Sequence, residues 1–148
     1  MVEPGRYIPA ESGVLLGTVQ AIKYNGAEKY IGTDLGMSVL IRPVLYNAHH
    51  DIEVYRKHGS LIDPGVETVE IVGNICETGD YLAISRELPI IKEGDILAVM
   101  DAGAYGHVMS HNYNQRLRPP ELLIKEDGSL KLIRSRDSIE DIGRNYII

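Results

Sequence analysis

The only cysteine of this 148-residue chain lies in the stretch VGNICETGDYLA. Cys76 is followed directly by Glu77, and a Gly-Asp pair then indicates a turn. Free cysteine is among the most buried residue types, so Cys76 can be a small apolar side chain at the end of a strand. A thiol held beside an acid can also donate a proton at a reaction site. Composition alone leaves both interpretations open.

Two further pairs of residues combine a charged side chain with a second polar group. Glu3 and Arg6 flank a Pro-Gly turn, which can point both side chains at one ligand or leave them as a surface ion pair. Arg42 and Tyr46 lie four residues apart in IRPVLY, on one face if this segment is helical. A guanidinium beside a phenol is a good receptor for a carboxylate. A solvated arginine on an amphipathic turn is the alternative.

The segment DAGAYG places Tyr105 after small residues, which permit a close approach of the backbone to a ligand. Tyr105 could then contact a phosphate or a ring, or it could lie exposed on an ordinary tight turn. His107 and His111 have the i, i+4 spacing of a metal pair, and NAHHD adds two more histidines. Because a third ligand with recognisable spacing is missing, we predict no metal site.

Composition narrows the class of protein. The net charge is −6 and no lysine- or arginine-rich run is present, so we expect no nucleic-acid partner. No apolar stretch approaches the length of a membrane span, so we expect no membrane insertion. One cysteine excludes an internal disulfide and favours a reducing, cytoplasmic location. A chain of this length fits one domain with its own core.

Short apolar segments alternate with turn signals along most of the chain. Asn-Gly at 25–26 predicts a hairpin that joins a strand over 13–24 to one over 28–34. A second hairpin is predicted within 121–136, folded at Glu-Asp-Gly-Ser. Further expected features are strands within 51–58, 66–75 and 94–103, and an Asp-Pro-Gly turn at 63–65.

Helical turns are expected only in 38–48 and 107–114, with a short C-terminal helix over 138–145. Ser138 can cap this helix, with Asp141 three residues further on. Many short strands with few helical segments predict a mainly β domain, a Greek-key-like sandwich or barrel with short helices.

In combination, four motifs resemble a known family. EPGR, DLGMSVLIRPVLY, CETGD and DAGAYGHVMSHNYNQRLRPPE, spread over residues 3 to about 124, resemble the C-terminal part of the diaminopimelate decarboxylases. These enzymes belong to the alanine racemase-like (fold type III) pyridoxal-phosphate decarboxylases. EPGR alone also fits ornithine and arginine decarboxylases, whereas RPVLY together with CETGD and AYGHVMSHNYN favours diaminopimelate.

The resemblance implies a chain that is part of a larger enzyme. Family members have a TIM barrel followed by a β-domain, and they are homodimers with active sites at the subunit interface. Residues 1–148 would be the β-domain, with 1–12 as the barrel-junction segment and 137–148 as a C-terminal helix and tail. The lysine that binds pyridoxal 5'-phosphate lies in the barrel of the family, so the chain alone is expected to be inactive.

The resemblance also implies cofactor contacts. Glu3 would face the pyridine nitrogen and keep it protonated, so that the ring can act as an electron sink. Gly5 and Arg6 would lie at the phosphate end of the site, where Arg6 could also reach a substrate carboxylate. Tyr105 would contact both cofactor and substrate.

The remaining implied roles concern the substrate, meso-2,6-diaminopimelate, which the family converts to L-lysine and carbon dioxide in lysine biosynthesis. Arg42 and Tyr46 would bind the carboxylate at the distal, non-reacting end. Glu77 would bind the distal ammonium group. Cys76 would donate the proton that replaces carbon dioxide, in the site of the partner subunit.

Two alternatives stay open from the sequence. One is a decarboxylase of ornithine or arginine type, although those substrates have no distal carboxylate for Arg42 to bind. The other is a non-catalytic β-module that dimerises or binds a partner.

Overall fold

The computed structural model describes residues 1–57 and 64–147, so Asp63 of the predicted Asp-Pro-Gly turn lies outside the described residues. The chain divides into two compact units, Met1–Ser110 and His111–Ile148. In the described part of the chain, no helix has the length and apolar character needed to cross a membrane.

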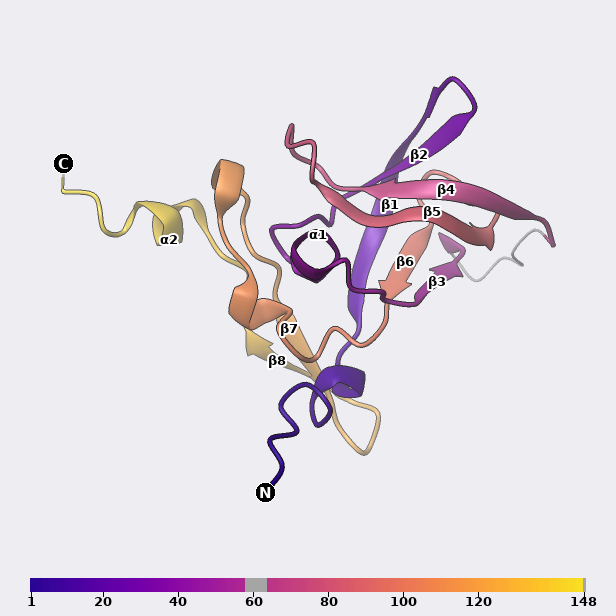
Figure 1. Cartoon of the computed structure of the whole chain (residues 1–148). Coiled ribbons are helices and arrows are strands. Elements are labelled where there is room, and N and C mark those ends of the chain that lie inside the picture. The colour runs from indigo at the N-terminus through magenta and orange to yellow at the C-terminus, as the bar shows by residue number, and fades with distance from the viewer. Residues whose placement is uncertain (58–63, 148) are drawn as a thin grey trace. The chain divides into compact units, whose positions relative to one another are not determined.

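Unit 1 is built around one six-stranded sheet (Figure 1). Its strand order is β3-β6-β1-β2-β4-β5, and all neighbours are antiparallel except β2 and β4. The edge strands β3 and β5 also contact each other, which nearly closes the sheet into a barrel. This confirms the predicted mainly β barrel with short helices. The strands are β1 (Leu15–Asn25), β2 (Glu28–Thr33), β3 (Ile52–Tyr55), β4 (Val66–Val72), β5 (Tyr81–Pro89) and β6 (Ile96–Val99).

The Asn-Gly signal marks the β1–β2 hairpin, as predicted. Asn25 pairs with Glu28, which leaves Gly26 and Ala27 as a two-residue turn. Gly26 has a φ of +62°, a conformation that glycine adopts without steric cost.

Strand β5 has no counterpart among the predicted strands. Its alternation of buried and exposed residues is broken at Ile84 and Ser85, which together oppose the single residue Glu70 of β4. The Glu70 carboxylate accepts hydrogen bonds from the Ser85 N–H and hydroxyl, at 3.0 and 3.3 Å. This β-bulge obscures the period-two pattern from which a strand is predicted.

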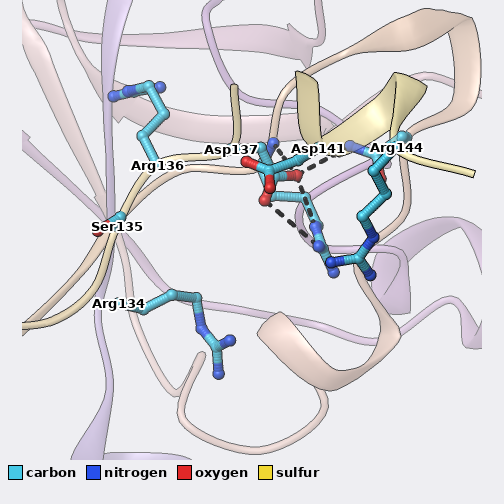
Figure 2. Close-up of a pocket in the computed structure, with 8 residues that line it drawn as sticks. Arg134, Ser135, Arg136, Asp137, Asp141 and Arg144 are labelled. Carbon is cyan, nitrogen blue, oxygen red and sulfur yellow. Dashed lines mark hydrogen bonds and ion pairs between the residues drawn. The ribbon is translucent and has the colours of Figure 1, made fainter. Parts of the chain in front are cut away.

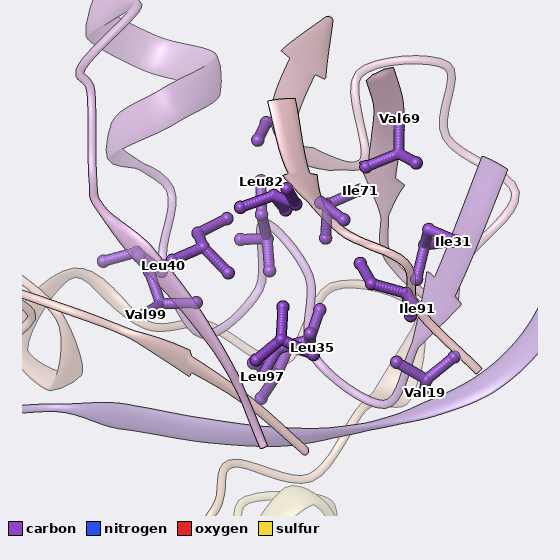
Figure 3. Close-up of a cluster of buried hydrophobic side chains, with 14 residues drawn as sticks. Val19, Ile31, Leu35, Leu40, Val69, Ile71, Leu82, Ile91, Leu97 and Val99 are labelled. Carbon is purple, nitrogen blue, oxygen red and sulfur yellow. The ribbon is translucent and has the colours of Figure 1, made fainter. Parts of the chain in front are cut away.

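The core of unit 1 lies inside the nearly closed sheet (Figure 3). Side chains from β1, β2, β4, β5 and β6 point toward one another there, and Leu35 and Leu40 join them from the segment between β2 and α1. Leu40 is fully buried two residues before α1 begins. The core therefore anchors the segment that leads into this helix. The largest fully buried apolar residues are Val19, Ile31, Leu40, Val69, Ile71, Leu82, Ile91, Leu97 and Val99.

The helical segments are short, as predicted. Helix α1 (Arg42–Tyr46) has a proline in its first turn and ends at Asn47, whose left-handed conformation is typical of a helix C-cap. Among the described residues, 3-10 turns are present at η1 (Ala10–Ser12), η3 (His107–Met109) and η4 (Tyr113–Gln115). Turn η1 lies outside the segments predicted to be helical.

Unit 2 contains the second predicted hairpin and the C-terminal helix. Strands β7 (Glu121–Ile124) and β8 (Leu130–Arg134) pair antiparallel across the predicted turn. Helix α2 (Ile139–Gly143) begins with a capping box: the Ser138 side chain accepts from the Asp141 N–H, and the Asp141 carboxylate accepts from the Ser138 N–H.

Replacing a core isoleucine should destabilise unit 1 far more than replacing an exposed one. Ile71 is 0% exposed, so Ile71→Ala should lower the free energy of unfolding by about 2–5 kcal/mol. Ile84→Ala is the control, because Ile84 is 57% exposed. This replacement should lower the free energy of unfolding by less than about 1 kcal/mol. Urea denaturation followed by circular dichroism gives both values. Equal costs would contradict the assigned core.

Candidate active site

Cys76 and Glu77 lie on the loop that connects β4 to β5. The Gly73 N–H donates to the Asp80 carbonyl at 2.8 Å, and the Asp80 N–H donates to the Glu77 carbonyl at 3.0 Å. These two bonds close the loop over residues 73–80. Both the Cys76 and Glu77 side chains are exposed at its tip. The alternative of a small buried cysteine is therefore wrong.

The same loop contains a buried carboxylate that the sequence motifs did not single out. Asp80 is 4% exposed. Its Oδ1 accepts the Met37 N–H at 2.7 Å, and its Oδ2 accepts the Ile75 N–H at 3.0 Å. A Cβ on Gly36 would lie 2.5 Å from Oδ1, and a Cβ on Gly73 would also overlap the carboxylate. Both positions thus require glycine because the Asp80 carboxylate lies directly against the backbone.

Helix α1 carries Arg42 at its first position and Tyr46 at its last, so the helical spacing predicted for this pair is present. Tyr46 is 60% exposed. Arg42 is half-buried, and its Nε is a buried donor with no hydrogen-bond partner. The 73–80 loop packs beside this helix, since a Cβ on Gly79 would lie 3.4 Å from Cγ1 of Val44.

Tyr105 lies on the loop that follows β6 and contacts Arg42. The Arg42 guanidinium carbon is 5.9 Å from the centre of the Tyr105 ring, a cation–π arrangement. Tyr105 has a φ of +61°, a conformation that tyrosine rarely adopts. A Cβ on Gly5 would lie 3.1 Å from the Tyr105 hydroxyl oxygen. The structure thus brings Gly5, Arg42 and Tyr105 together from three separate segments.

Two backbone hydrogen bonds connect the N-terminal segment to this loop. The Ala102 N–H donates to the Gly13 carbonyl at 2.8 Å, and the Gly103 N–H donates to the Ala10 carbonyl at 3.0 Å. Glu3 and Arg6 lie on the exposed turn that precedes these contacts. The turn is closed by the Gly5 N–H, which donates to the Glu3 carbonyl at 2.9 Å.

His50 is a buried neighbour of Arg42 that the sequence offered only as part of a histidine cluster. It is 2% exposed, and its Nδ1 lies 2.8 Å from the Met100 carbonyl. Burial lowers the pKa of the His50 imidazole, and the charges of Arg42 and Arg6 act in the same direction. Neutral His50 must therefore donate from Nδ1, because a carbonyl only accepts. Its Nε2 is then a buried acceptor without a hydrogen-bond partner.

The charges around Tyr105 fit an anionic group. Arg42 supplies a buried donor without an acceptor, and His50 is neutral beside it. The charges that act on His50 are the positive ones of Arg42 and Arg6 and the opposing negative one of Asp101. A carboxylate or a phosphate could accept from the Arg42 donor. Residues 1–57 and 64–147 contain no group of three or more His, Cys, Asp or Glu side chains that could hold a metal ion.

Two surface pockets contain none of the predicted site residues in their linings. One, of about 430 Å³, is lined by two separate segments. The first is α1 with the residues that follow it, including Asn47 and His49, and the second is β5, including Arg86. The other, of about 250 Å³, lies within unit 2 (Figure 2). There the Arg118 guanidinium and the Asn112 amide both donate to the Asp137 carboxylate. Neither of these pockets includes a predicted site residue.

Comparison with known proteins defines the class of this chain. Residues 7–103 match the family described as the C-terminal sheet domain of pyridoxal-dependent decarboxylases. Because the match covers more than half of the 148 residues, the chain belongs to this family.

Several curated relatives are diaminopimelate decarboxylases. The chain is 46% identical over 143 residues to the Aquifex aeolicus protein, covering 96% of this chain and 33% of that protein. It is 42% identical over 143 residues to the Methanothermobacter thermautotrophicus protein, covering 97% of this chain and 32% of that protein. The predicted resemblance to the C-terminal part of diaminopimelate decarboxylases is confirmed. The chain spans about a third of the length of these relatives.

Solved structures agree with this assignment. The crystal structure of diaminopimelate decarboxylase from M. jannaschii matches with a TM-score of 0.89 at 38% identity. The structure of the same enzyme in co-complex with L-lysine matches with a TM-score of 0.88 at 37% identity. Each match covers 97% of this chain and 32% of the solved chain.

Unit 2 should lose stability in acid through Asp137. Hydrogen bonds from Arg118 and Asn112 hold the pKa of the Asp137 carboxyl well below its usual range. A carboxyl whose folded pKa is depressed stabilises the fold above its unfolded pKa of about 3.9, and this stabilisation is lost as the pH falls below that value. Asp137→Asn should cost about 1–3 kcal/mol at pH 6 and less at pH 3.

Urea denaturation, followed through NMR signals of α2, measures this cost at both pH values. Glu126→Gln, in the exposed turn between β7 and β8, is the control and should change little at either pH. A cost of Asp137→Asn that does not depend on pH would contradict the assigned ion pair.

Proposed function

We propose that this chain is the C-terminal β-domain of a diaminopimelate decarboxylase. In this proposal it acts with a TIM-barrel domain to convert meso-2,6-diaminopimelate into L-lysine and carbon dioxide. The observation that carries the proposal is the buried, unpartnered Nε of Arg42 beside Tyr105, in a chain 46% identical to the Aquifex aeolicus enzyme. The L-lysine bound in the M. jannaschii relative supports a substrate of this chemical class.

Arg42 and Tyr46 bind the distal carboxylate of the substrate in this mechanism. A guanidinium can donate two parallel hydrogen bonds to a carboxylate, and the phenol of Tyr46 can donate a third. The Tyr105 ring packs against the Arg42 guanidinium and restricts its orientation.

Glu77 and Cys76 act on two other parts of the substrate, the distal ammonium group and the reacting carbon. The Glu77 carboxylate pairs with the distal ammonium group, so that both charges of the non-reacting end are matched. The Cys76 thiol donates the proton to the carbon from which carbon dioxide departs. Their exposure at a loop tip is consistent with contribution to the active site of a partner subunit in a homodimer.

Glu3, Gly5, Arg6 and Tyr105 would hold the cofactor, pyridoxal 5'-phosphate. The absence of a side chain at Gly5 leaves space beside the Tyr105 hydroxyl, and Arg6 offers a positive charge for the phosphate. Glu3 would accept a hydrogen bond from the protonated ring nitrogen. When bound, the cofactor supplies an electron-withdrawing ring that stabilises the negative charge left by decarboxylation.

Residues 1–12 form the junction to the barrel in this proposal, and 137–148 form the C-terminal helix and tail. The barrel contributes the lysine that holds the cofactor, so the isolated chain should not catalyse the reaction. The single cysteine supports a cytoplasmic location for the enzyme.

Joining this chain to the barrel of the Aquifex aeolicus relative tests the proposal. The joined protein should release carbon dioxide from meso-diaminopimelate when pyridoxal phosphate is supplied, and the isolated chain should not. L-Ornithine and L-arginine are the competing substrates. A joined protein that folds and binds the cofactor, but prefers either of them, would contradict the proposed substrate.

Arg42→Ala should specifically destroy recognition of the distal carboxylate. In the joined protein, kcat/KM for meso-diaminopimelate should fall about a hundredfold or more, because truncating a buried charge-paired donor costs about 2–5 kcal/mol. Any slow turnover of L-lysine, which lacks that carboxylate, should change much less. The exposed Arg136→Ala serves as the matched control. Equal losses for both substrates would show that Arg42 does not act by binding the distal carboxylate.

A further inference from the structure

Asp80 connects the two segments that carry the proposed substrate-binding and proton-donating groups. Its Oδ1 accepts the Met37 N–H at 2.7 Å and its Oδ2 accepts the Ile75 N–H at 3.0 Å. Ile75 directly precedes Cys76, whereas Met37 lies five residues before Arg42. We propose that Asp80 is a positioning residue, which fixes the Cys76–Glu77 loop against the segment leading into α1; this inference rests on the proposed function.

Within the 73–80 loop, Asp80 makes hydrogen bonds to residues before Cys76 and after it. The carboxylate accepts the N–H just before Cys76, and the Asp80 N–H donates to the carbonyl of Glu77 at 3.0 Å. The Asp80 carbonyl accepts the Gly73 N–H at 2.8 Å. The segment that carries Cys76 and Glu77 is thus held by three hydrogen bonds, and each of them involves Asp80.

Outside the loop, the Asp80 carboxylate also holds the turn that precedes α1. The Met37 N–H is fixed by Asp80, and the Val39 and Leu40 N–H groups both donate to the Gly36 carbonyl at 3.1 Å. Leu40 is fully buried in the core, and α1 follows it with Ile41 as its N-cap. The position of Arg42 is therefore set by the same turn that the Asp80 carboxylate contacts.

The chemistry of these contacts requires a carboxylate and not an amide. Each oxygen of Asp80 accepts a backbone N–H, and an asparagine would turn its NH2 group toward one of these donors. Gly36 and Gly73 leave no room for the side chain to move away. In the described part of the chain, this 4% exposed carboxylate accepts from the backbone N–H groups of Met37 and Ile75, so its charge organises loops.

Asp34 provides a matched control in the same region. Its Oδ1 accepts the Thr18 N–H at 2.7 Å, a bond as short as the one from Met37 to Asp80. Only one of its side-chain oxygens makes this contact, so Asp34→Asn can keep the bond with its own carbonyl oxygen. Asp34→Asn should therefore retain activity, whereas Asp80→Asn should not.

The first arm measures amide hydrogen exchange in the 148-residue chain by NMR. Asp80→Asn should raise the exchange rates of the Met37 and Ile75 amides about tenfold or more, because at least one charge-assisted hydrogen bond is lost. Core amides such as Ile31 should stay protected, and Asp34→Asn should leave the Met37 and Ile75 amides unchanged. Unaltered exchange at both amides in Asp80→Asn would overturn the proposed connection.

The second arm measures turnover of meso-diaminopimelate in the barrel-joined protein, well below the unfolding midpoint of each variant. Asp80→Asn should lower kcat about a hundredfold, the scale expected when a reacting group is displaced by about 1 Å. A residue that only stabilises the fold would lower the unfolding midpoint and leave kcat unchanged, and this result would overturn the positioning role.

A double-mutant cycle shows whether Asp80 acts through the thiol. In a Cys76→Ala background, Asp80→Asn should lower kcat by a much smaller factor than in the otherwise wild-type protein, because the thiol, one of the groups that it positions, is already absent. If the losses in kcat caused by Asp80→Asn and Cys76→Ala simply multiply in the double variant, Asp80 does not act through the thiol. If the joined wild-type protein is inactive, the proposed function fails, and the hydrogen-exchange arm alone decides whether Asp80 connects the loops.

Discussion

The carboxylate of Asp80 occupies space that is open only because Gly36 and Gly73 have no side chains. A buried anion is costly unless hydrogen bonds replace its water, and here two backbone N–H groups do so. Those donors belong to different loops, one before α1 and one before Cys76. Satisfying this one charge therefore constrains both segments at once, and the geometry of the proposed site depends on it.

The six-stranded barrel supplies a rigid base for these loops. Its apolar core extends into the segment that precedes α1 through Leu35 and Leu40, so the helix is held to the core by packing as well as by hydrogen bonds. The proposed functional groups Arg42, Tyr105 and Cys76 all lie on connections between strands and not on the strands themselves. This division is common, because a packed scaffold can position chemically active loops.

Local signals in the sequence predicted the features that short segments determine. The Asn-Gly turn at Gly26 and the capping box at Ser138 depend on neighbouring residues, and both are present. Strand β5 was missed because the bulge at Ser85 breaks its alternation. The burial of His50 and the two contacts of Asp80 arise from segments far apart in the chain, so a single sequence contained no local pattern that could indicate them.

In the proposed enzyme, this chain supplies substrate-binding and proton-donating groups, while a separate barrel supplies the lysine that holds the cofactor. Borohydride reduction in the presence of pyridoxal phosphate, followed by intact-mass measurement, shows which domain carries that lysine. We expect no stoichiometric adduct on the isolated chain, and a single adduct on a barrel lysine once the barrel of a relative is added. One clean adduct on a lysine of the isolated chain would show instead that this chain holds the cofactor by itself.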